Sequence, residues 1–479
     1  MSKKLSLAIT MLLFALSGVS LAQTLTSLVH PAPNGAIVEY LLTDGSVMVQ
    51  GNSCSDWWKL TPSSSGSYVK GTWKQVASLP SGYAPYATAG AVLADGRLLL
   101  SGGEYSNCGA QFTLTNQSAI YDPKKNTWTM VAPPKGWYDI GDSPSLVLPN
   151  GKFLLGRKTN KDMAVLDPTT LKWTAVGSAG KSDFDAEEGW TLMPDGTILT
   201  YDVKNNPNSE IYDPSTQTWT SAGSTKANLQ GPPAEGCIPY GHNHTYCPPG
   251  EVGPGILRPD GTVFATGAFH MNASAGHTAI YNPAAAAPDK WTAGPDFPNG
   301  DAAGDSYAAL LPNGNVLVLG NSGNMYEFNG SSLTRTTQGF GSLMVLPTGQ
   351  VLAGGVAAYT STGTYQSSWA PRITSSPATV TRGSTYKISG QQFNGLSQAA
   401  AFGDEFETAT NYPLVRITNT ASGHVVYAKT HDHSTMGVAT GTATVFTHFD
   451  VPANIETGAS SLQVVANGIP SKRVSVTVQ

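Results

Sequence analysis

Four acidic residues occupy equivalent places in successive repeats of this chain. Each precedes the glycine of a recurring turn by nine or ten residues. The acidic residues are Asp142, Glu187, Glu251 and Asp305, and the turn glycines are Gly151, Gly196, Gly261 and Gly314. Glu188 lies beside Glu187, and Asp142 and Asp305 share the local sequence Gly-Asp-Ser. Only 32 of 479 residues are acidic, so chance is a poor explanation for this pattern.

Carboxylates that converge in a folded protein must be neutralised by a cation, by raised pKa values or by hydrogen bonds. A hard cation such as Ca²⁺ suits oxygen ligands, so the four residues are candidate metal ligands. Two carboxylates at a suitable separation could instead act as acid and base on a glycosidic bond. Alternatively, each carboxylate accepts backbone N–H bonds and only holds the repeats together.

Seven similar hairpins must position these residues. An apolar run, a short turn with glycine and a second apolar run recur at intervals of 35 to 65 residues. The turn glycines are Gly45, Gly96, Gly151, Gly196, Gly261, Gly314 and Gly349. Asp-Gly or Asn-Gly between apolar runs indicates a hairpin, and we expect primed turns, which need positive φ. Seven such hairpins predict a seven-bladed β-propeller in an all-β protein.

A second signature supplies two further strands for most repeats. A Tyr-Asp-Pro turn leads to a tryptophan seven residues after its tyrosine, as from Tyr121 to Trp128 and from Tyr212 to Trp219. We expect these aromatic residues to pack between neighbouring blades. The last repeat lacks such a strand, so residues near Leu25 to Val29 are predicted to supply it and close the ring.

Composition and the N-terminus indicate an exported protein. The chain is 12 % charged, has 52 Gly and 32 Pro, and carries a formal net charge of −5, which argues against a nucleic-acid partner. Residues 1–22 are predicted to be a signal peptide, with Lys3 and Lys4 before an apolar run and a small residue at Ala22. No later apolar run is long enough to span a membrane. We therefore expect a periplasmic or secreted protein.

Four cysteines in an exported chain suggest two disulfides. They are Cys54, Cys108, Cys237 and Cys247. Three pairings are possible, and free buried thiols are the alternative.

The repeats stop at Trp369-Ala370-Pro371, and short alternating runs such as TYKIS and RVSVTV follow to the C-terminus. This pattern fits an immunoglobulin-like sandwich at 370–479. Gly102-Gly103 and Gly354-Gly355 match the kelch double glycine. Together these features resemble the secreted kelch-repeat proteins of the galactose oxidase and glyoxal oxidase type. The resemblance implies a kelch propeller at 23–369 and a galactose oxidase-like C-terminal domain of the immunoglobulin-like E-set kind.

Residues that the resemblance would require for copper are not found. The family's oxidases bind copper through two tyrosines and two histidines, with one tyrosine cross-linked to a cysteine. The positions of the Tyr-His pair hold Gly339 and Phe340, and only Tyr86 comes close to the cross-linked tyrosine. The hairpin that would carry the remaining histidine matches Phe402 to Leu414, which has none. Copper is therefore not expected, and fold alone does not assign an activity.

The family geometry places the start of each innermost strand at the top of the central channel. The equivalent positions here are Ala36, Tyr86, Asp142, Glu187, Glu251, Asp305 and Phe340. Loops after the second strand of each blade reach the same face, and Cys54 and Cys108 lie in two such loops on adjacent blades. We therefore favour the pairing Cys54–Cys108, and Cys237–Cys247 would close a small loop.

The loop between Cys237 and Cys247 would bring His242 and His244 to this face, and His270 and His277 follow in the next loop. Histidines near carboxylates could bind a transition metal, although surface histidines are the simpler interpretation. Trp57, Trp58 and Tyr240 could stack on sugar rings, although blade packing explains the tryptophans equally well.

The leading hypothesis is a secreted, copper-free propeller that binds an extracellular ligand, expected to be carbohydrate, at an acidic top face. Its candidate ligand-binding residues are Tyr86, Asp142, Glu187, Glu188, Glu251, Asp305, His242, His244, His270 and Trp57. An enzyme is the alternative, either a divergent oxidase or a carboxylate-based carbohydrate hydrolase or lyase. A purely structural envelope protein is a third possibility. We expect a monomer with no membrane span. Ca²⁺ is the cofactor that the carboxylates favour, no cofactor is assigned, and copper is not expected.

Overall fold

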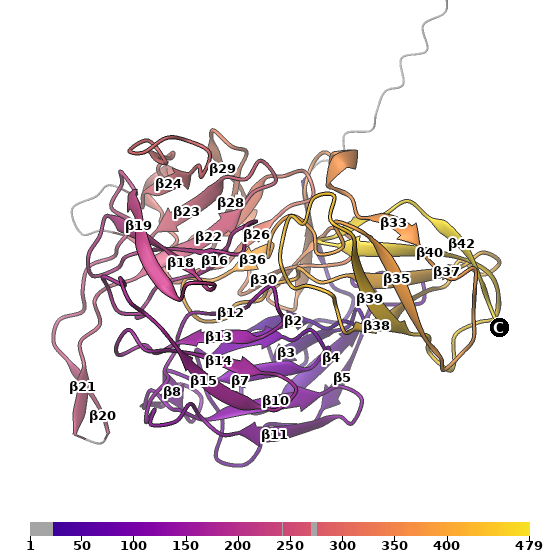
Figure 1. Ribbon diagram of the computed structural model, residues 1–479, viewed down its shortest axis with the longest axis horizontal. Coiled ribbons are helices and arrows are strands. Elements are labelled where there is room, and N and C mark those ends of the chain that lie inside the picture. The colour runs from indigo at the N-terminus through magenta and orange to yellow at the C-terminus, as the bar shows by residue number, and fades with distance from the viewer. Residues whose placement is uncertain (1–22, 242, 270–274) are drawn as a thin grey trace, which may run out of the picture.

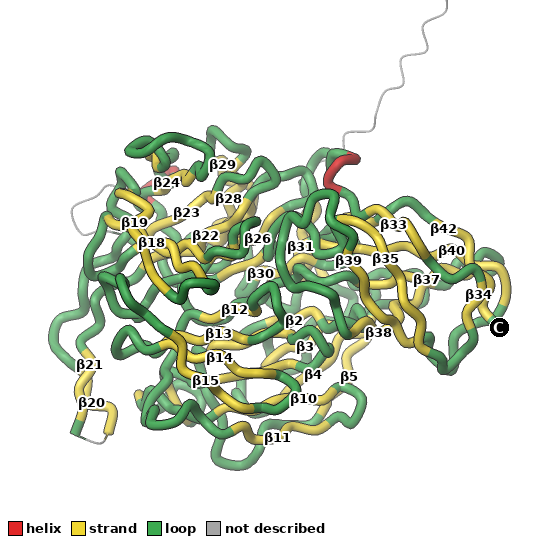
Figure 2. Tube along the Cα trace, viewed as in Figure 1, coloured by secondary structure: helices red, strands yellow, loops and turns green. Residues whose placement is uncertain are grey.

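A computed structural model describes residues 23–241, 243–269 and 275–479 of the chain. The predicted signal peptide, His242 and His270 lie outside the described residues. Strands and loops make up almost all of the described chain (Figure 2). Two short 3-10 turns are the only helical elements in these ranges, η1 (Pro298–Gly300) and η2 (Ser367–Trp369).

Seven antiparallel sheets surround a central channel and form a seven-bladed propeller (Figure 1). Blade 1 contains β2 (Glu39–Leu41), β3 (Val47–Gln50), β4 (Trp57–Thr61) and β5 (Thr72–Val76). Blade 2 contains β6 (Ala89–Val92), β7 (Leu98–Ser101), β10 (Ser118–Asp122) and β11 (Thr127–Val131). Blade 3 contains β12 (Ser145–Val147), β13 (Phe153–Gly156), β14 (Met163–Asp167) and β15 (Lys172–Val176). Blade 4 contains β16 (Thr191–Leu192), β17 (Ile198–Tyr201), β18 (Asn208–Asp213) and β19 (Thr218–Ser224).

The remaining blades follow the same order from the channel outward. Blade 5 contains β22 (Val252–Leu257), β23 (Val263–Gly267), β24 (Thr278–Tyr281) and β25 (Trp291–Ala293). Blade 6 contains β26 (Ala308–Leu310), β27 (Val316–Leu319), β28 (Asn324–Phe328) and β29 (Leu333–Gln338). Blade 7 contains β30 (Leu343–Val345), β31 (Val351–Ala353), β32 (Ala357–Thr360) and β1 (Thr24–Ser27). Two small hairpins lie in loops: β8 (Tyr105–Ser106) with β9 (Gln111–Phe112), and β20 (Ile238–Gly241) with β21 (His244–Tyr246).

The predicted ring closure is confirmed. Strand β1, from the start of the described chain, pairs antiparallel with β32, in a register that runs from Thr24 opposite Thr360 to Ser27 opposite Ala357. The first and last segments of the propeller therefore share blade 7, which leaves fewer unpaired strand edges.

The seven hairpin turns are present, but they are not primed two-residue turns. In blade 1, Gly45 donates to the Leu42 carbonyl and Leu42 donates to the Ser46 carbonyl, and all seven turns repeat this pattern. Only the glycine of each turn has positive φ, between 73° and 87°. This is a three-residue loop in which the glycine forms a bulge. The requirement for positive φ was predicted correctly, and the turn type was wrong.

The repeated aromatic residues pack between blades as expected. Tyr121 and Trp128 face each other across β10 and β11, with ring centroids 5.2 Å apart. The Trp128 indole nitrogen donates to the carbonyl of Ala77, at the end of blade 1, over 2.9 Å. Burial of these large rings therefore stabilises the contact between neighbouring blades.

The two predicted disulfides are present, Cys54–Cys108 and Cys237–Cys247. The first joins the loop after β3 in blade 1 to the β8–β9 hairpin of blade 2. Such bonds suggest a secreted or extracellular protein. No helix among the described residues is long and apolar enough to cross a membrane.

A second sheet follows the propeller and has its own core around residues such as Val380, Ile388 and Phe449. Its strands are β33 (Arg372–Ser375), β34 (Thr379–Val380), β35 (Thr385–Gln391), β37 (Leu414–Asn419), β38 (Val425–His431), β39 (Val445–Asp450), β40 (Gly458–Ala466), β41 (Ile469–Pro470) and β42 (Val474–Val478). They run in the order β33-β35-β39-β38-β37-β40-β42-β34, with β41 paired to β40.

One strand of the C-terminal region belongs to a propeller sheet and not to the C-terminal sheet. Strand β36 (Ala400–Ala401) pairs with the innermost strand of blade 6, with Ala401 opposite Ala308. It also contacts the innermost strands of blades 5 and 7, so it lies in the channel (Figure 1). A salt bridge of 2.8 Å between Lys124 and Asp450 further attaches the C-terminal sheet to blade 2.

The turn geometry predicts the effect of one glycine substitution. Gly261 has a φ of +84°, and an added Cβ there would meet no atom within 4 Å. Gly261→Ala should therefore lower the free energy of unfolding by about 1 kcal/mol through backbone conformation alone. Gly261→Asn should cost less, because asparagine tolerates this conformation better. Urea unfolding of both variants measures the difference, and equal losses would contradict the explanation.

Candidate functional site

A residue with left-handed backbone stands at or beside each predicted channel position. Four are glycines, and the others are Ala87, Glu187 and Asp305, with φ values of 55°, 57° and 44°. This conformation costs a residue other than glycine about 1–2 kcal/mol. Two of the four predicted carboxylates are therefore held in strained backbone by the surrounding fold, which is common at functional sites.

Asp142 and Glu187 converge on Lys158, a residue that the sequence analysis did not select. The Lys158 ammonium lies 2.6 Å from Asp142 Oδ2 and 2.6 Å from Glu187 Oε1. Glu104 approaches the same ammonium to 3.7 Å, and the lysine side chain is fully buried. The positive charge therefore comes from the chain itself. Its signal in the sequence was a lysine two residues after the apolar second strand of blade 3, where loops reach the top face.

The segment after β36 brings further acids to this lysine. Asp404 Oδ2 lies 4.0 Å from the Lys158 ammonium. Asp404 and Glu405 are buried, and each offers an oxygen that lies within 4.8 Å of an oxygen of Asp142. The region between Phe402 and Leu414 thus occupies the channel, but it contributes carboxylates that the sequence analysis did not predict.

One lysine cannot neutralise all of these carboxylates. Burial, followed by the charges of neighbouring carboxylates, holds the pKa values of Asp142 and Glu251 well above their usual range. Glu187 differs, because Lys158 and the hydrogen bonds to its carboxylate outweigh burial and lower its pKa. Burial opposes the charge of Lys158, but Asp142 and Glu187 keep its pKa well above the ordinary value. The channel therefore combines the Lys158–Glu187 ion pair with carboxyl groups whose pKa values are raised.

Glu251 is half-buried and Asp305 is exposed, whereas Asp142 and Glu187 are buried, so the first two mark the mouth of the channel. The two carboxyl groups interact, and the charge of Asp305 contributes to the raised pKa of Glu251. Asp305 as a whole residue is exposed, but burial of its carboxyl group and the charge of Glu187 raise its pKa to about 7. Tyr86 and Phe340, at two further predicted positions, are 40 % and 47 % exposed. The mouth therefore presents acidic and aromatic groups together.

Glu188 does not belong to this group, although it follows Glu187 in the chain. Its carboxylate accepts hydrogen bonds of 3.0 and 2.7 Å from Lys181, which also lies 2.8 Å from Glu210. Burial raises the pKa of the neighbouring Asp185 to about 7. Glu188 thus packs in a separate buried ion cluster. This contradicts its inclusion among the candidate ligand-binding residues.

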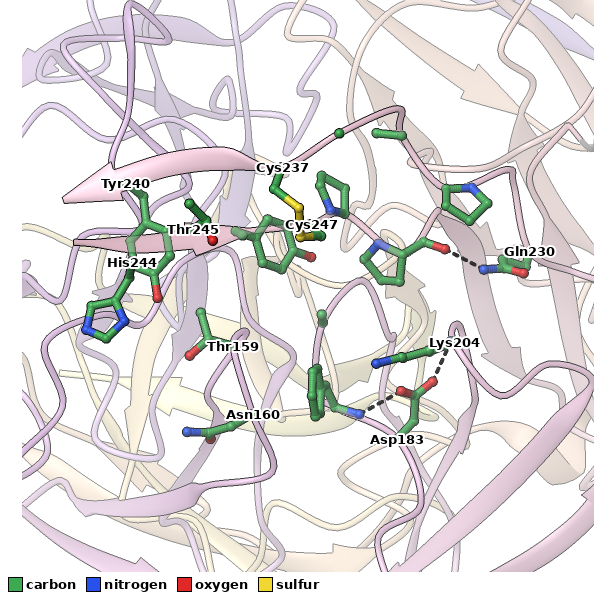
Figure 3. A pocket seen from close by; sticks show the side chains of 18 of the residues that line it. Thr159, Asn160, Asp183, Lys204, Gln230, Cys237, Tyr240, His244, Thr245 and Cys247 are labelled. Carbon is green, nitrogen blue, oxygen red and sulfur yellow. Dashed lines mark hydrogen bonds between the residues drawn. A yellow bond between two sulfur atoms is a disulfide. The ribbon is translucent and has the colours of Figure 1, made fainter. Parts of the chain in front are cut away.

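A cleft of about 810 Å³ lies beside the channel, between the β20–β21 hairpin and the loops of blades 3 and 4 (Figure 3). Its lining includes Tyr138, Phe184, Lys204, His244 and Tyr246. The Cys237–Cys247 disulfide closes the hairpin at one end of the cleft (Figure 3). The hydroxyl of Tyr246 donates to Glu187 Oε1 over 2.6 Å, so a cleft residue also contacts the acidic channel.

The hairpin is held over blade 3 by aromatic and polar contacts. The His244 ring stacks on Tyr138, with centroids 4.5 Å apart. The Tyr240 hydroxyl donates to Asp139 Oδ2 over 3.0 Å, and Asp139 also pairs with Arg157 over 2.5 Å. His244 therefore lies in the cleft, where it contacts an aromatic ring.

Two other predicted residues have structural partners. Trp57 is fully buried, with its ring centroid 5.2 Å from that of Trp128 in blade 2, so it is a packing residue and not a sugar platform. His277 pairs with Asp296 over 2.7 Å. These contacts favour the simpler interpretations that the sequence left open for tryptophan and histidine.

Comparisons with known proteins give similarity in structure only. No protein-family profile matches the chain, and no curated protein matches it. A fungal alcohol oxidase of the AA5 family, in complex with copper, aligns at 14 % identity and a TM-score of 0.49, over 96 % of this chain and 100 % of that chain. A virginiamycin B lyase from Staphylococcus aureus aligns at 10 % identity and a TM-score of 0.46, over 71 % and 98 %. At these values neither similarity carries an argument about binding or catalysis.

The position of Lys158 predicts a pH-dependent stability. Lys158→Met should cost about 3–5 kcal/mol at pH 7, because it leaves buried carboxylates without their cation. In the native protein the pKa of Glu187 is lowered from its ordinary value of 4.5, so the ionised group stabilises the fold at pH values above 4.5. This stabilisation is lost as the pH falls through the lowered pKa of the folded protein. In the Lys158→Met protein, burial raises the pKa of Glu187, so Glu187 takes up a proton as the pH falls. The loss of stability relative to the native protein should therefore become smaller between pH 7 and pH 4.

Urea unfolding at several pH values measures this deficit. Lys125→Met is the matched control, because Lys125 is exposed and its 3.5 Å ion pair with Asp122 should contribute less than about 1 kcal/mol. A Lys158→Met deficit as small as that of the control, or one that stays constant with pH, would contradict the assignment.

Proposed function

We propose that this protein is an exported kelch-type propeller with a C-terminal immunoglobulin-like domain, and that it binds extracellular carbohydrate at its top face. The observation that carries the binding proposal is the cleft of about 810 Å³ that adjoins the acidic channel through Tyr246. A volume of this size is typical of ligand sites in proteins.

The cleft combines the two kinds of group that bind sugars. Phe184 is 37 % exposed, and a flat apolar ring of this kind can stack on the C–H face of a pyranose. Asn160 and Thr159 also line the cleft, are partly exposed, and offer an amide and a hydroxyl group for sugar hydroxyls. Lys204, with its ammonium 4.7 Å from the Phe184 ring centroid, adds a positive charge beside the aromatic surface.

The proposal does not include copper-radical chemistry. The positions expected to carry a Tyr-His ligand pair hold Gly339 and Phe340, and the segment from Phe402 to Leu414 contains no histidine. The residues described around Lys158 are carboxylates, which suit hard cations better than copper.

Removal of the exposed ring in the cleft tests the binding proposal. A panel of cellulose, xylan, pectin and chitin fragments first identifies the oligosaccharide that the native protein binds best. Phe184→Ala should then weaken its binding about tenfold in calorimetric titration, because a stacking surface worth about 1.4 kcal/mol is lost.

Met130→Ala is the matched control, since Met130 is 42 % exposed on strand β11, away from the cleft-lining residues, and its truncation should not change affinity. Failure of the native protein to bind any carbohydrate would overturn the proposal. Equal affinity of the native and Phe184→Ala proteins would exclude the cleft as the binding site.

A second candidate function is acid–base cleavage of a polysaccharide. It is favoured by carboxyl groups whose pKa values are shifted in opposite directions, lowered at Glu187 and raised to about 7 at Asp305. An ionised carboxylate and a protonated carboxyl group in one site are the pair that such a reaction requires. Asp305, at the mouth, is the group that a substrate can reach.

Glu187→Gln tests this candidate. We expect turnover to fall at least about a hundredfold while the far-ultraviolet circular dichroism stays native, since the amide keeps the shape but not the charge. Release of reducing ends reports hydrolysis, and absorbance from a new double bond reports a lyase. Glu188→Gln should retain turnover, because Glu188 faces the separate Lys181 cluster. No turnover by the native protein on any polysaccharide would exclude the enzyme and leave the binding proposal intact.

A further inference from the structure

The channel holds many more carboxyl groups than cations. Seven acidic residues interact with one another around Lys158, which is the only lysine or arginine among the described residues that forms an ion pair with any of them. They are Glu104, Asp142, Glu187, Glu251, Asp305, Asp404 and Glu405. Buried carboxylates without a counter-charge are costly, so the arrangement favours an additional cation.

Three of these residues form a group of suitable size. Asp142, Asp404 and Glu405 are all buried, and each offers an oxygen within 4.8 Å of the other two. Ca²⁺ binds oxygen at about 2.3–2.6 Å, so two ligands on opposite sides of one ion lie about 5 Å apart. The spacing of the three oxygens is therefore of the size that a shared Ca²⁺ ion requires.

Unpartnered oxygen atoms in the same group point independently to a ligand. Lys158 occupies Oδ2 of Asp142, whereas Asp142 Oδ1 accepts no hydrogen bond from the described residues. Asp404 Oδ2 also accepts none, and its contact with the Lys158 ammonium is long, at 4.0 Å. The two side chains are only 5 % and 1 % exposed. Buried carboxylate oxygens normally have a donor or a metal partner, so these two atoms require an explanation.

We propose that Asp142, Asp404 and Glu405 bind a hard divalent cation, Ca²⁺, beside Lys158. Asp142 then bridges the two positive groups, with one oxygen on the ammonium and the other on the ion. Water molecules complete the coordination shell, since Ca²⁺ takes six to eight oxygen ligands.

This ligand set differs from the one predicted from the repeats. Only Asp142 comes from a blade, and the other two ligands come from the segment that follows β36. The ion therefore joins the C-terminal segment to blade 3 inside the channel, in addition to the strand pairing with blade 6.

Calorimetric titration of Ca²⁺ into protein stripped with chelator tests the site directly. We expect one Ca²⁺ per chain with a dissociation constant of about 1 mM or tighter, as for other extracellular sites, and a higher thermal midpoint with the ion bound. Asp404→Asn should weaken the binding at least about tenfold. Asp202→Asn is the matched control, because Asp202 lies in the Lys181 cluster and should leave the affinity unchanged.

A second variant is expected to change the affinity for Ca²⁺ in the opposite direction. Lys158→Met removes the competing positive charge, so Ca²⁺ should bind more tightly and should recover part of the stability that the substitution costs. The absence of saturable Ca²⁺ binding by the native protein would overturn the proposal. So would an Asp404→Asn protein that binds Ca²⁺ as tightly as the native one. Neither result bears on the carbohydrate cleft, which is tested by Phe184→Ala.

Discussion

The buried ammonium group of Lys158 is the interaction on which the top of the channel depends. It lies against carboxylates from blades 3 and 4 and near Asp404 from the C-terminal region. Without a positive charge, this concentration of buried acids would oppose the assembly of the blades. The same lysine makes Glu187 the ionised member of the group, and Glu187 in turn accepts the hydroxyl of Tyr246 from the cleft hairpin. One charge therefore couples the propeller, the C-terminal segment and the edge of the cleft.

The acidic side chains meet in the channel because each blade repeats the same backbone conformation before its innermost strand. Each innermost strand starts beside a residue in the left-handed conformation, and neighbouring innermost strands contact one another around the channel. Side chains at this position therefore converge from several blades. Glycine would adopt the conformation at little cost, yet Glu187 and Asp305 occupy it with side chains that reach other acids. The position thus combines a structural turn with an acidic side chain in two blades.

The sequence was sufficient for features that depend on local pattern. The turn glycines, the closing strand near Leu25 and the pair Cys237–Cys247 follow from the pattern of the sequence, whereas the pair Cys54–Cys108 follows from the family resemblance. The runs TYKIS and RVSVTV lie on β35 and β42. Features that depend on long-range contacts were missed. Lys158 belongs to no repeated signature, and Asp404 reaches the channel only because β36 pairs with blade 6. Glu187 and Glu188 look equivalent in the sequence, but they face different lysines, because adjacent residues can point in different directions.

The closing strand has a consequence for how the chain is made. A ribosome delivers β1 first, whereas its partner β32 emerges only after every strand of the first six blades. During synthesis β1 has no native partner, and the nascent ring cannot become a closed circle. Long-range pairing of this kind slows folding and leaves strand edges exposed meanwhile. A prematurely terminated chain that lacks β32 would therefore remain an open arc, which cellular quality control could distinguish from the finished molecule.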